Sequence, residues 1–236
     1  MGNVMIRQSE TLLKIGLFRS LDATRISRLD SQCSWRRASP NEWIIDYQDE
    51  NNDVFFVVKG MVRVKLQAVS GREVFLRDIN AGEFFGELAA IDLKPRSSGI
   101  MALTEVSVAR MPAAVFQATV LEHPDVCKQL LTLLASQIRT LANRINEFTN
   151  LDAKYRIYAE LLRLSRSQTA NPNQGSISPP PSHSEIAARV SIRREAVARE
   201  VAMLVRAGLV ERRRGALVLT DIAWLKKMID EASETD

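Results

Sequence analysis

The chain of 236 residues is 46% hydrophobic and 25% charged with a net charge of +4, a balance typical of a globular protein with one large or two modest domains. Two cysteines are too few for a four-cysteine iron–sulfur cluster, two histidines exclude a His-rich metal site, and no apolar run reaches the roughly 18 residues of a membrane span. The first ten residues lack the apolar core of a signal peptide, so we expect a cytoplasmic protein with reduced thiols, no metal and no membrane partner.

The first half of the chain is predicted to contain a helix followed by many short strands. Apolar residues recur at helical intervals from Leu12 to Asp30. From Trp35 to Met111, short apolar or alternating runs are separated by turns at a spacing of about ten residues, which favours a β-sandwich or barrel. The strand candidates are 53–59, 61–66, 73–77, 100–104 and 106–110, and the turn candidates are 70–72 and 80–82.

A long helix is predicted to begin at His123-Pro124 and to run to about Asn150, because the spacing of apolar residues changes there to a helical period. Its single narrow stripe favours pairing with a twin helix in a parallel, coiled-coil-like dimer. Packing of the stripe against the helix's own domain is the alternative. The stripe consists of Leu130, Leu134, Gln137, Leu141, Ile145 and Phe148.

The C-terminal part is predicted to follow the order helix, turn, helix, hairpin. A helix over 151–165 is followed by a segment, 168–181, whose Asn, Pro, Gly and Ser content predicts a loop. Ser182 and Glu185 form a capping box that starts the next helix. A second helix then runs to Gly208, and a hairpin follows over 209–219. This order is typical of a winged helix-turn-helix.

The excess positive charge lies in this same region. Residues 182–215 hold eight arginines and four glutamates, so the remainder of the chain has no net charge. Such a concentration predicts a polyanionic partner, and a solvated basic face is the alternative.

One motif resembles the phosphate-binding cassette of cyclic-nucleotide-binding domains: residues 82–98 read GEFFGELAAIDLKPRSS, with the Gly-Glu pair, spacer and Pro-Arg-Ser of that pattern. Together with the helix-turn-helix, the motif makes the chain similar to regulators of the CRP/FNR family, in the branch of the cAMP receptor. The resemblance implies an α+β fold with an N-terminal β-roll of the double-stranded β-helix type, a dimerisation helix and a winged helix-turn-helix. The expected domains are 1–122, 123–150 and 151–236.

The resemblance implies that the cassette binds cAMP, cGMP or both. Arg96 can hold two phosphate oxygens with a charge-assisted fork, Ser97 adds a hydroxyl, and Gly86 allows close approach of the backbone. Glu87 would accept from the ribose 2′-hydroxyl, and in an empty pocket it is expected to pair with Arg96. Further pocket positions implied by the family are Val64, Leu76, Phe85 and Leu88.

The contacts to the nucleobase are expected to differ from those of the family. Its Thr-Ser pair on the long helix is replaced here by Leu141-Ala142. Thr140 and Asn143 are the nearest polar groups on that helix that can both donate and accept hydrogen bonds. We therefore expect them to meet the base, and cAMP and cGMP to bind within about tenfold of each other.

The second helix of the DNA module carries the triad Arg194, Glu195 and Arg199, which resembles the recognition triad of the family. Arginine can bind O6 and N7 of guanine, and glutamate can accept from N4 of cytosine. The resemblance implies a palindromic, TGTGA-like DNA site. Ser182, Arg193 and Arg213 are expected to contact phosphates, which position the protein without specifying sequence.

Taken together, these features predict a bacterial, homodimeric, cyclic-nucleotide-dependent transcription regulator with no catalytic residues. Its expected partners are double-stranded DNA, the nucleotide as allosteric ligand, a second copy of the chain and RNA polymerase. Ligand binding is expected to bias a hinge near 150–152. A regulator that binds DNA without ligand, or that senses a different second messenger, remains the alternative. A cupin-like enzyme is disfavoured because 35–111 contains no histidine.

Overall fold

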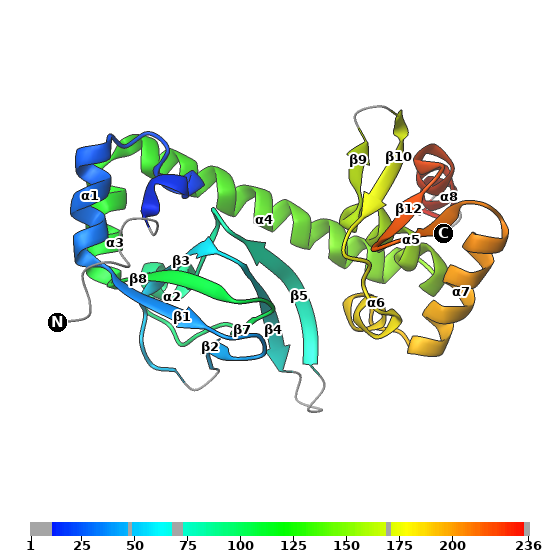
Figure 1. Cartoon of the computed structure of the whole chain (residues 1–236), viewed down its shortest axis with the longest axis horizontal. Coiled ribbons are helices and arrows are strands. Elements are labelled where there is room, and N and C mark those ends of the chain that lie inside the picture. The colour runs from blue at the N-terminus through cyan, green and yellow to red at the C-terminus, as the bar shows by residue number, and fades with distance from the viewer. Residues whose placement is uncertain (1–10, 47–48, 68–72, 169–170, 234–236) are drawn as a thin grey trace. The chain divides into compact units, whose positions relative to one another are not determined.

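The computed structural model describes residues 11–46, 49–67, 73–168 and 171–233. The chain divides into two compact units, Met1–Ser136 and Gln137–Asp236, and the long helix α4 (Pro124–Asn150) contributes residues to both (Figure 1). No helix within the described ranges is long and apolar enough to cross a membrane.

Two four-stranded antiparallel sheets form the first unit, in the orders β1-β8-β3-β6 and β2-β7-β4-β5. Their facing side chains, among them Val57, Val64, Phe85 and Ile100, form one apolar core, which confirms the predicted sandwich or barrel. The expected strands are all present, whereas the predicted turn at 70–72 lies outside the described residues. The strands are β1 (Ser34–Ala38), β2 (Trp43–Ile45), β3 (Val54–Lys59), β4 (Met61–Gln67), β5 (Glu73–Asn80), β6 (Phe84–Phe85), β7 (Gly99–Ala102) and β8 (Val106–Met111).

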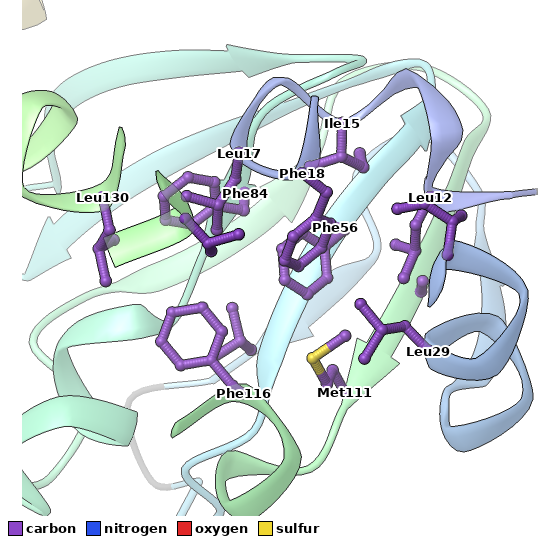
Figure 2. Close-up of a cluster of buried hydrophobic side chains, with 14 of the residues drawn as sticks. Leu12, Ile15, Leu17, Phe18, Leu29, Phe56, Phe84, Met111, Phe116 and Leu130 are labelled. Carbon is purple, nitrogen blue, oxygen red and sulfur yellow. The ribbon is translucent and has the colours of Figure 1, made fainter. Parts of the chain in front are cut away.

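A second core lies on the other face of the β1-β8-β3-β6 sheet. Figure 2 shows Phe56 of β3 at its centre, where the ring centroids of Phe18, Phe84 and Phe116 lie 5.0, 6.0 and 6.5 Å away. The helices over this face are two short 3-10 helices (Leu12–Lys14 and Gly16–Phe18), α1 (Ala23–Gln32), α3 (Ala113–Glu122) and the start of α4.

The prediction of one helical segment over 12–30 was wrong in its first half. The chain forms two 3-10 helices there, and the α-helix starts only after Asp22, whose carboxylate accepts from the backbone N–H of Arg25. Leu17, Ile26 and Leu29 are buried as the helical spacing predicted, whereas Leu13, which shares that spacing, is 59% exposed. A 3-10 helix, with three residues per turn, presents nearly the same apolar face as an α-helix, which explains the misleading period.

The predicted long helix is confirmed from Pro124 to Asn150, but its apolar stripe does not form a single surface. Leu130 is 4% exposed and belongs to the core of the first unit, and Leu134 packs against the same core. Leu141 and Ile145 are exposed instead. The beginning of the stripe therefore follows the alternative of packing against its own domain.

The second unit packs helices against a four-stranded sheet of order β11-β12-β10-β9. The expected helix, turn, helix and hairpin are confirmed: α6 and α7 flank Ser191, and β11 pairs with β12 around Arg214-Gly215. The second unit also contains α8, which the sequence patterns did not indicate. Its elements are α5 (Ala153–Leu164), β9 (Arg166–Gln168), β10 (Asn171–Ile177), α6 (His183–Val190), α7 (Arg194–Arg206), β11 (Val210–Arg213), β12 (Ala216–Leu219) and α8 (Ile222–Ser233).

The prediction of a loop over 168–181 was wrong for most of that range. In β10, Gly175 lies opposite Leu219 of β12 and Ile177 lies opposite Leu217. Strand β9 pairs along the other edge of β10. The composition of this segment is poor for a strand, but pairing with a well-formed neighbour outweighs local propensity.

Candidate functional site

The cassette-like motif folds into strand β6, a left-handed turn and the short helix α2 (Glu87–Asp92). Gly86 occupies the turn with a φ of 86°. A Cβ at this position would lie 2.7 Å from Nη1 of Arg96 and 2.9 Å from the carbonyl oxygen of Asp53. Only glycine therefore allows the backbone to approach the guanidinium this closely.

The guanidinium of Arg96 is buried and oriented by neutral acceptors. Nη1 donates to the carbonyl oxygen of Gly86 at 2.9 Å, and Nη2 donates to Oδ1 of Asn51 at 2.6 Å and to the carbonyl oxygen of Asp53 at 2.8 Å. Its Cζ lies 5.9 Å from the ring centroid of Phe55. The side chain is thus fixed in place before any ligand binds.

Two features make this arginine a ready anion site. Nε is buried and has no hydrogen-bond partner among the described residues, which leaves a costly unpaired donor. Burial also lowers the pKa of the Arg96 guanidinium, and the carboxylate of Asp53, whose charge opposes this shift, is engaged by Nε of Arg110 at 2.5 Å. An anion entering the site would therefore gain a positioned, partly desolvated cation.

Glu87 begins α2 and is 6% exposed. Burial raises the pKa of its carboxyl group above the usual range, although its own backbone N–H and the charges of Arg77 and Arg96 oppose the rise. The expected pair between Glu87 and Arg96 was wrong, because the guanidinium is turned toward carbonyl and amide oxygens and the two side chains form no ion pair. The buried carboxyl therefore remains available to accept from a ligand hydroxyl.

The remaining cassette positions differ in exposure. Phe85 is buried and stacks on Phe55 with 5.2 Å between ring centroids, while Val64 and Leu76 line the same apolar core. Ser97 is exposed, and the side chain of Leu88 is 47% exposed on the outer side of α2.

The contribution of Asn51, Asp53 and Phe55 was not foreseen from the sequence. These residues lead into and begin β3, and they hold Arg96 in its orientation. In the sequence, Asn51 and Asp53 are marked only by their place in a polar run before a buried strand.

Thr140 and Asn143, expected at the nucleobase, lie on the part of α4 that belongs to the second unit. Both side chains are exposed and lie within one turn of each other on the helix.

The second unit presents a positive helix to solvent. Ser182 caps α6 through the full capping box with Glu185, and Arg193 is the N-cap residue of α7. The triad of Arg194, Glu195 and Arg199 is exposed at the start of α7 and forms no hydrogen bond or ion pair among the described residues. The opposite face of α7 is buried through Val197, Val201 and Leu204. One side of α7 is thus packed in the core of the second unit, while the three triad side chains on the other side face solvent.

The hairpin β11–β12 adds further cations. Arg213 donates to Oε2 of Glu211 at 2.8 and 3.1 Å, and Nη2 of Arg212 lies 3.5 Å from Nε2 of His183. Burial and the charges of Arg212 and Arg194 lower the pKa of His183. His183 of α6 thus lies near cations of both the hairpin and α7.

Two family models match the chain. The cyclic nucleotide-binding domain matches residues 35–123, in the first unit, and the Crp-like helix-turn-helix domain matches residues 155–228, in the second.

Similar proteins cover most of the chain. A CRP-like cAMP-activated global transcriptional regulator of Mycobacterium tuberculosis is 24% identical over 213 residues, covering 90% of this chain and 95% of the relative. The cAMP-activated global transcriptional regulator Vfr of Pseudomonas aeruginosa is 27% identical over 189 residues, covering 78% and 88%. Among solved structures, a CooA mutant from Carboxydothermus hydrogenoformans has a similar fold, with a TM-score of 0.77 at 23% identity over 90% of this chain and 95% of that one.

Proposed function

Since the chain belongs to the CRP/FNR family of transcription regulators, we propose that it is a homodimeric, sequence-specific DNA-binding protein controlled by a cyclic nucleotide. The three expected parts, 1–122, 123–150 and 151–236, would bind the ligand, join the two copies and bind DNA. The protein would act through binding alone, without catalysis, and RNA polymerase would be its protein partner at promoters.

The observation that carries this proposal is the arrangement around Arg96. A buried guanidinium held by three neutral oxygens, with an unpaired Nε, is positioned to receive a cyclic phosphate. Glu87 begins α2 and directly follows Gly86, the N-cap residue of that helix. A carboxyl acceptor beside a phosphate-binding arginine matches a ribose cyclic phosphate, which offers an anion and a hydroxyl on one ring.

DNA would be recognised by α7. Its exposed triad of Arg194, Glu195 and Arg199 has the donors and the acceptor that distinguish G·C pairs in the major groove. Ser182, Arg193 and Arg213 would contact phosphates beside it. The resemblance of the triad to that of the family implies a TGTGA-like half-site.

The dimer would form along the second half of α4. Ile138, Leu141, Ile145 and Phe148 are 67%, 49%, 66% and 40% exposed, and they recur at intervals of three and four residues on one face. An apolar helical face of this kind is expected to be covered by a twin copy. Two DNA-binding units joined in this way would address a palindrome with half-sites about 34 Å apart.

The ligand would be cAMP, cGMP or both, with Thr140 and Asn143 meeting the base. Each can donate and accept, so neither selects adenine over guanine, and affinities within about tenfold follow. Thr140→Ala and Asn143→Ala, titrated separately with both nucleotides, test this. Unchanged affinities in both variants, or a thousandfold preference of the parent protein for cAMP, would contradict it.

Calorimetric titration with cAMP, cGMP and cyclic di-GMP tests the function as a whole, followed by mobility shifts of a TGTGA-containing duplex with and without each. We expect cAMP or cGMP to bind and to strengthen DNA binding. Tight DNA binding that no nucleotide changes would instead support a ligand-independent regulator. Strengthening by cyclic di-GMP alone would support a different second messenger.

A further inference from the structure

A row of three polar residues crosses the β1-β8-β3-β6 sheet near one end. Ser107 of β8 lies directly opposite Arg37 of β1 on one side and Lys59 of β3 on the other. Directly opposed residues on neighbouring strands point to the same face, with Cβ atoms about 5 Å apart. A short serine between two long cations therefore leaves a hollow between their stems.

The side chain of Ser107 is in an unusual state for a buried polar group. It is 3% exposed, and its Oγ has no hydrogen-bond partner among the described residues. A buried hydroxyl without a hydrogen-bond partner is destabilising, so such groups require an explanation. A ligand that accepts from this hydroxyl would supply the missing bond.

The hollow opens into a recess of about 510 Å³. The register of β3 shifts between Val57 and Lys59, so that Val58 and Lys59 both turn toward it. Lys14, at the end of the first 3-10 helix, adds a third cation. The recess is lined by Lys14, Arg37, Val58, Lys59, Glu105, Val106 and Ser107.

This recess is separate from the Arg96 site. Along β8, Val106 and Val108 belong to the core between the two sheets, whereas Ala109 and Met111 belong to the core on the other face. Since side chains alternate along a strand, Ser107 points to the same face as Ala109 and Met111. Phe55, beside Arg96, faces the core between the two sheets instead. The two sites therefore lie on opposite faces of one sheet.

We propose that the recess binds a small phosphorylated metabolite, with its phosphate on Ser107 and the three cations. A phosphate monoester carries about −1.5 to −2 charges and three acceptor oxygens, which suits several point charges and one hydroxyl donor. The recess falls within the range of about 300–1,000 Å³ for small-molecule sites, so it has room for an organic part beside the phosphate. Val58 gives that part an apolar wall, and the carboxylate of Glu105 can accept from a sugar hydroxyl.

Calorimetry on the full-length protein at constant ionic strength tests the proposal, with ribose 5-phosphate, inorganic phosphate and ribose as probes. We expect ribose 5-phosphate to bind, inorganic phosphate to bind more weakly, and ribose not to bind. Lys59→Gln and Ser107→Ala should each lower the affinity for ribose 5-phosphate by about tenfold. The first removes a charged contact to the phosphate, and the second removes a hydroxyl contact.

Two control variants and one stability measurement define the site. Lys94→Gln removes an exposed lysine whose partner is Asp92, and it should leave the affinity unchanged. Arg96→Leu should likewise keep its affinity for ribose 5-phosphate but lose its affinity for cyclic nucleotides. Ser107→Ala should melt no lower than the parent protein, because it removes an unpaired hydroxyl.

Three results would overturn the proposal: absence of binding by both phosphorylated probes, equal weakening by Lys94→Gln and Lys59→Gln, or loss of ribose 5-phosphate in Arg96→Leu. The last would place that ligand in the nucleotide pocket and leave the proposed function intact.

Discussion

At the scale of the single residue, the proposed binding of a cyclic phosphate depends on Arg96. Arg96→Leu leaves the anion without its positioned cation, and an uncompensated buried charge costs about 3–5 kcal/mol. We expect a loss of nucleotide affinity on the order of 10²-fold or more, measured by calorimetry. Arg28→Leu, on the exposed side of α1, is the matched control and should bind normally. Near-normal affinity of Arg96→Leu for both cAMP and cGMP would refute the site.

Glu87 gives a pH-dependent prediction. Burial raises the pKa of the Glu87 carboxyl in the folded state, whereas in the unfolded state this pKa is about 4.3. In the pH range between the two pKa values, the folded state therefore binds more protons than the unfolded state. Stability then falls as pH rises through that window, and the loss persists at neutral pH. Glu87→Gln removes this loss, so the unliganded variant should be more stable than the parent protein at pH 7, and the difference should shrink toward pH 4.

Urea unfolding of both proteins between pH 4 and pH 8 measures this difference, and calorimetry on the same samples should show weaker nucleotide binding by Glu87→Gln. A stability gain that stays constant over the whole pH range would contradict the assignment of the raised pKa to Glu87.

The sequence singled out the central residues of the candidate site, but not the residues that hold Arg96 in its orientation. Gly86, Glu87 and Arg96 lie in one short motif, whose residue types fit a phosphate and a ribose. The acceptors Asn51 and Asp53 are more than forty residues from Arg96 and reach it only through sheet pairing. Long-range contacts of this kind leave no periodic pattern in the sequence.

At the scale of secondary-structure elements, the second unit is joined by a buried ion cluster. Glu160 of α5 is fully buried and meets Nη1 of Arg189 from α6 at 3.5 Å and Nη2 of Arg144 from α4 at 3.9 Å. Arg163 contacts Glu160 as well, and its Nη2 donates to Oε1 of Glu147 at 2.5 Å. One carboxylate thus connects three helices.

Glu160→Gln should destabilise the second unit by about 3–5 kcal/mol, because it leaves buried guanidinium groups without their counter-charge. Thermal and urea unfolding measure the loss. Glu231→Gln, which breaks an exposed pair with Lys227, should cost no more than about 0.5 kcal/mol. Equal effects of the two variants would show that the cluster contributes no more than a surface pair.

Helix α7 and the hairpin are expected to contribute differently to DNA binding. Arg194→Ala should reduce discrimination at one base position by about 1–3 kcal/mol, because it removes a base contact. Arg213→Ala should weaken all sequences alike and flatten the salt dependence, since a phosphate contact carries no sequence information and Arg213 must first leave Glu211. Mobility shifts with single-mismatch duplexes at several salt concentrations distinguish the two. Unchanged mismatch penalties in Arg194→Ala would mean that α7 is not the reading helix.

Elements with strong local patterns were predictable and those that depend on pairing were not. The capping box at Ser182 and the stripe of α7 gave correct helices. β10 was missed because Asn171–Ile177 acquires its structure from the neighbouring β12, and the period at 12–30 could not distinguish 3-10 from α-helical turns.

At the scale of the whole molecule, α4 serves two roles along its length. Its first half contributes Val126 and Leu130 to the core of the first unit, and its second half presents Leu141 and Ile145 to solvent. Apolar spacing alone could not separate the two halves, because burial by the same chain and burial by a second copy require the same period.

The exposed half of α4 leads to a prediction about assembly. Ile145→Asp places a carboxylate in the proposed dimer seam, where two copies would face each other without a counter-charge. An unpaired buried charge costs about 3–5 kcal/mol, so the dimer should dissociate at micromolar concentration. Because Ile145 is 66% exposed, the fold of each chain should be preserved. Asn146→Asp adds the same charge one position off the stripe and should remain dimeric. Sedimentation equilibrium measures both, and mobility shifts should show Ile145→Asp losing its affinity for the palindrome while cyclic-nucleotide titration still reports a folded first unit. An Ile145→Asp protein that stays dimeric would exclude this face of α4 as the seam.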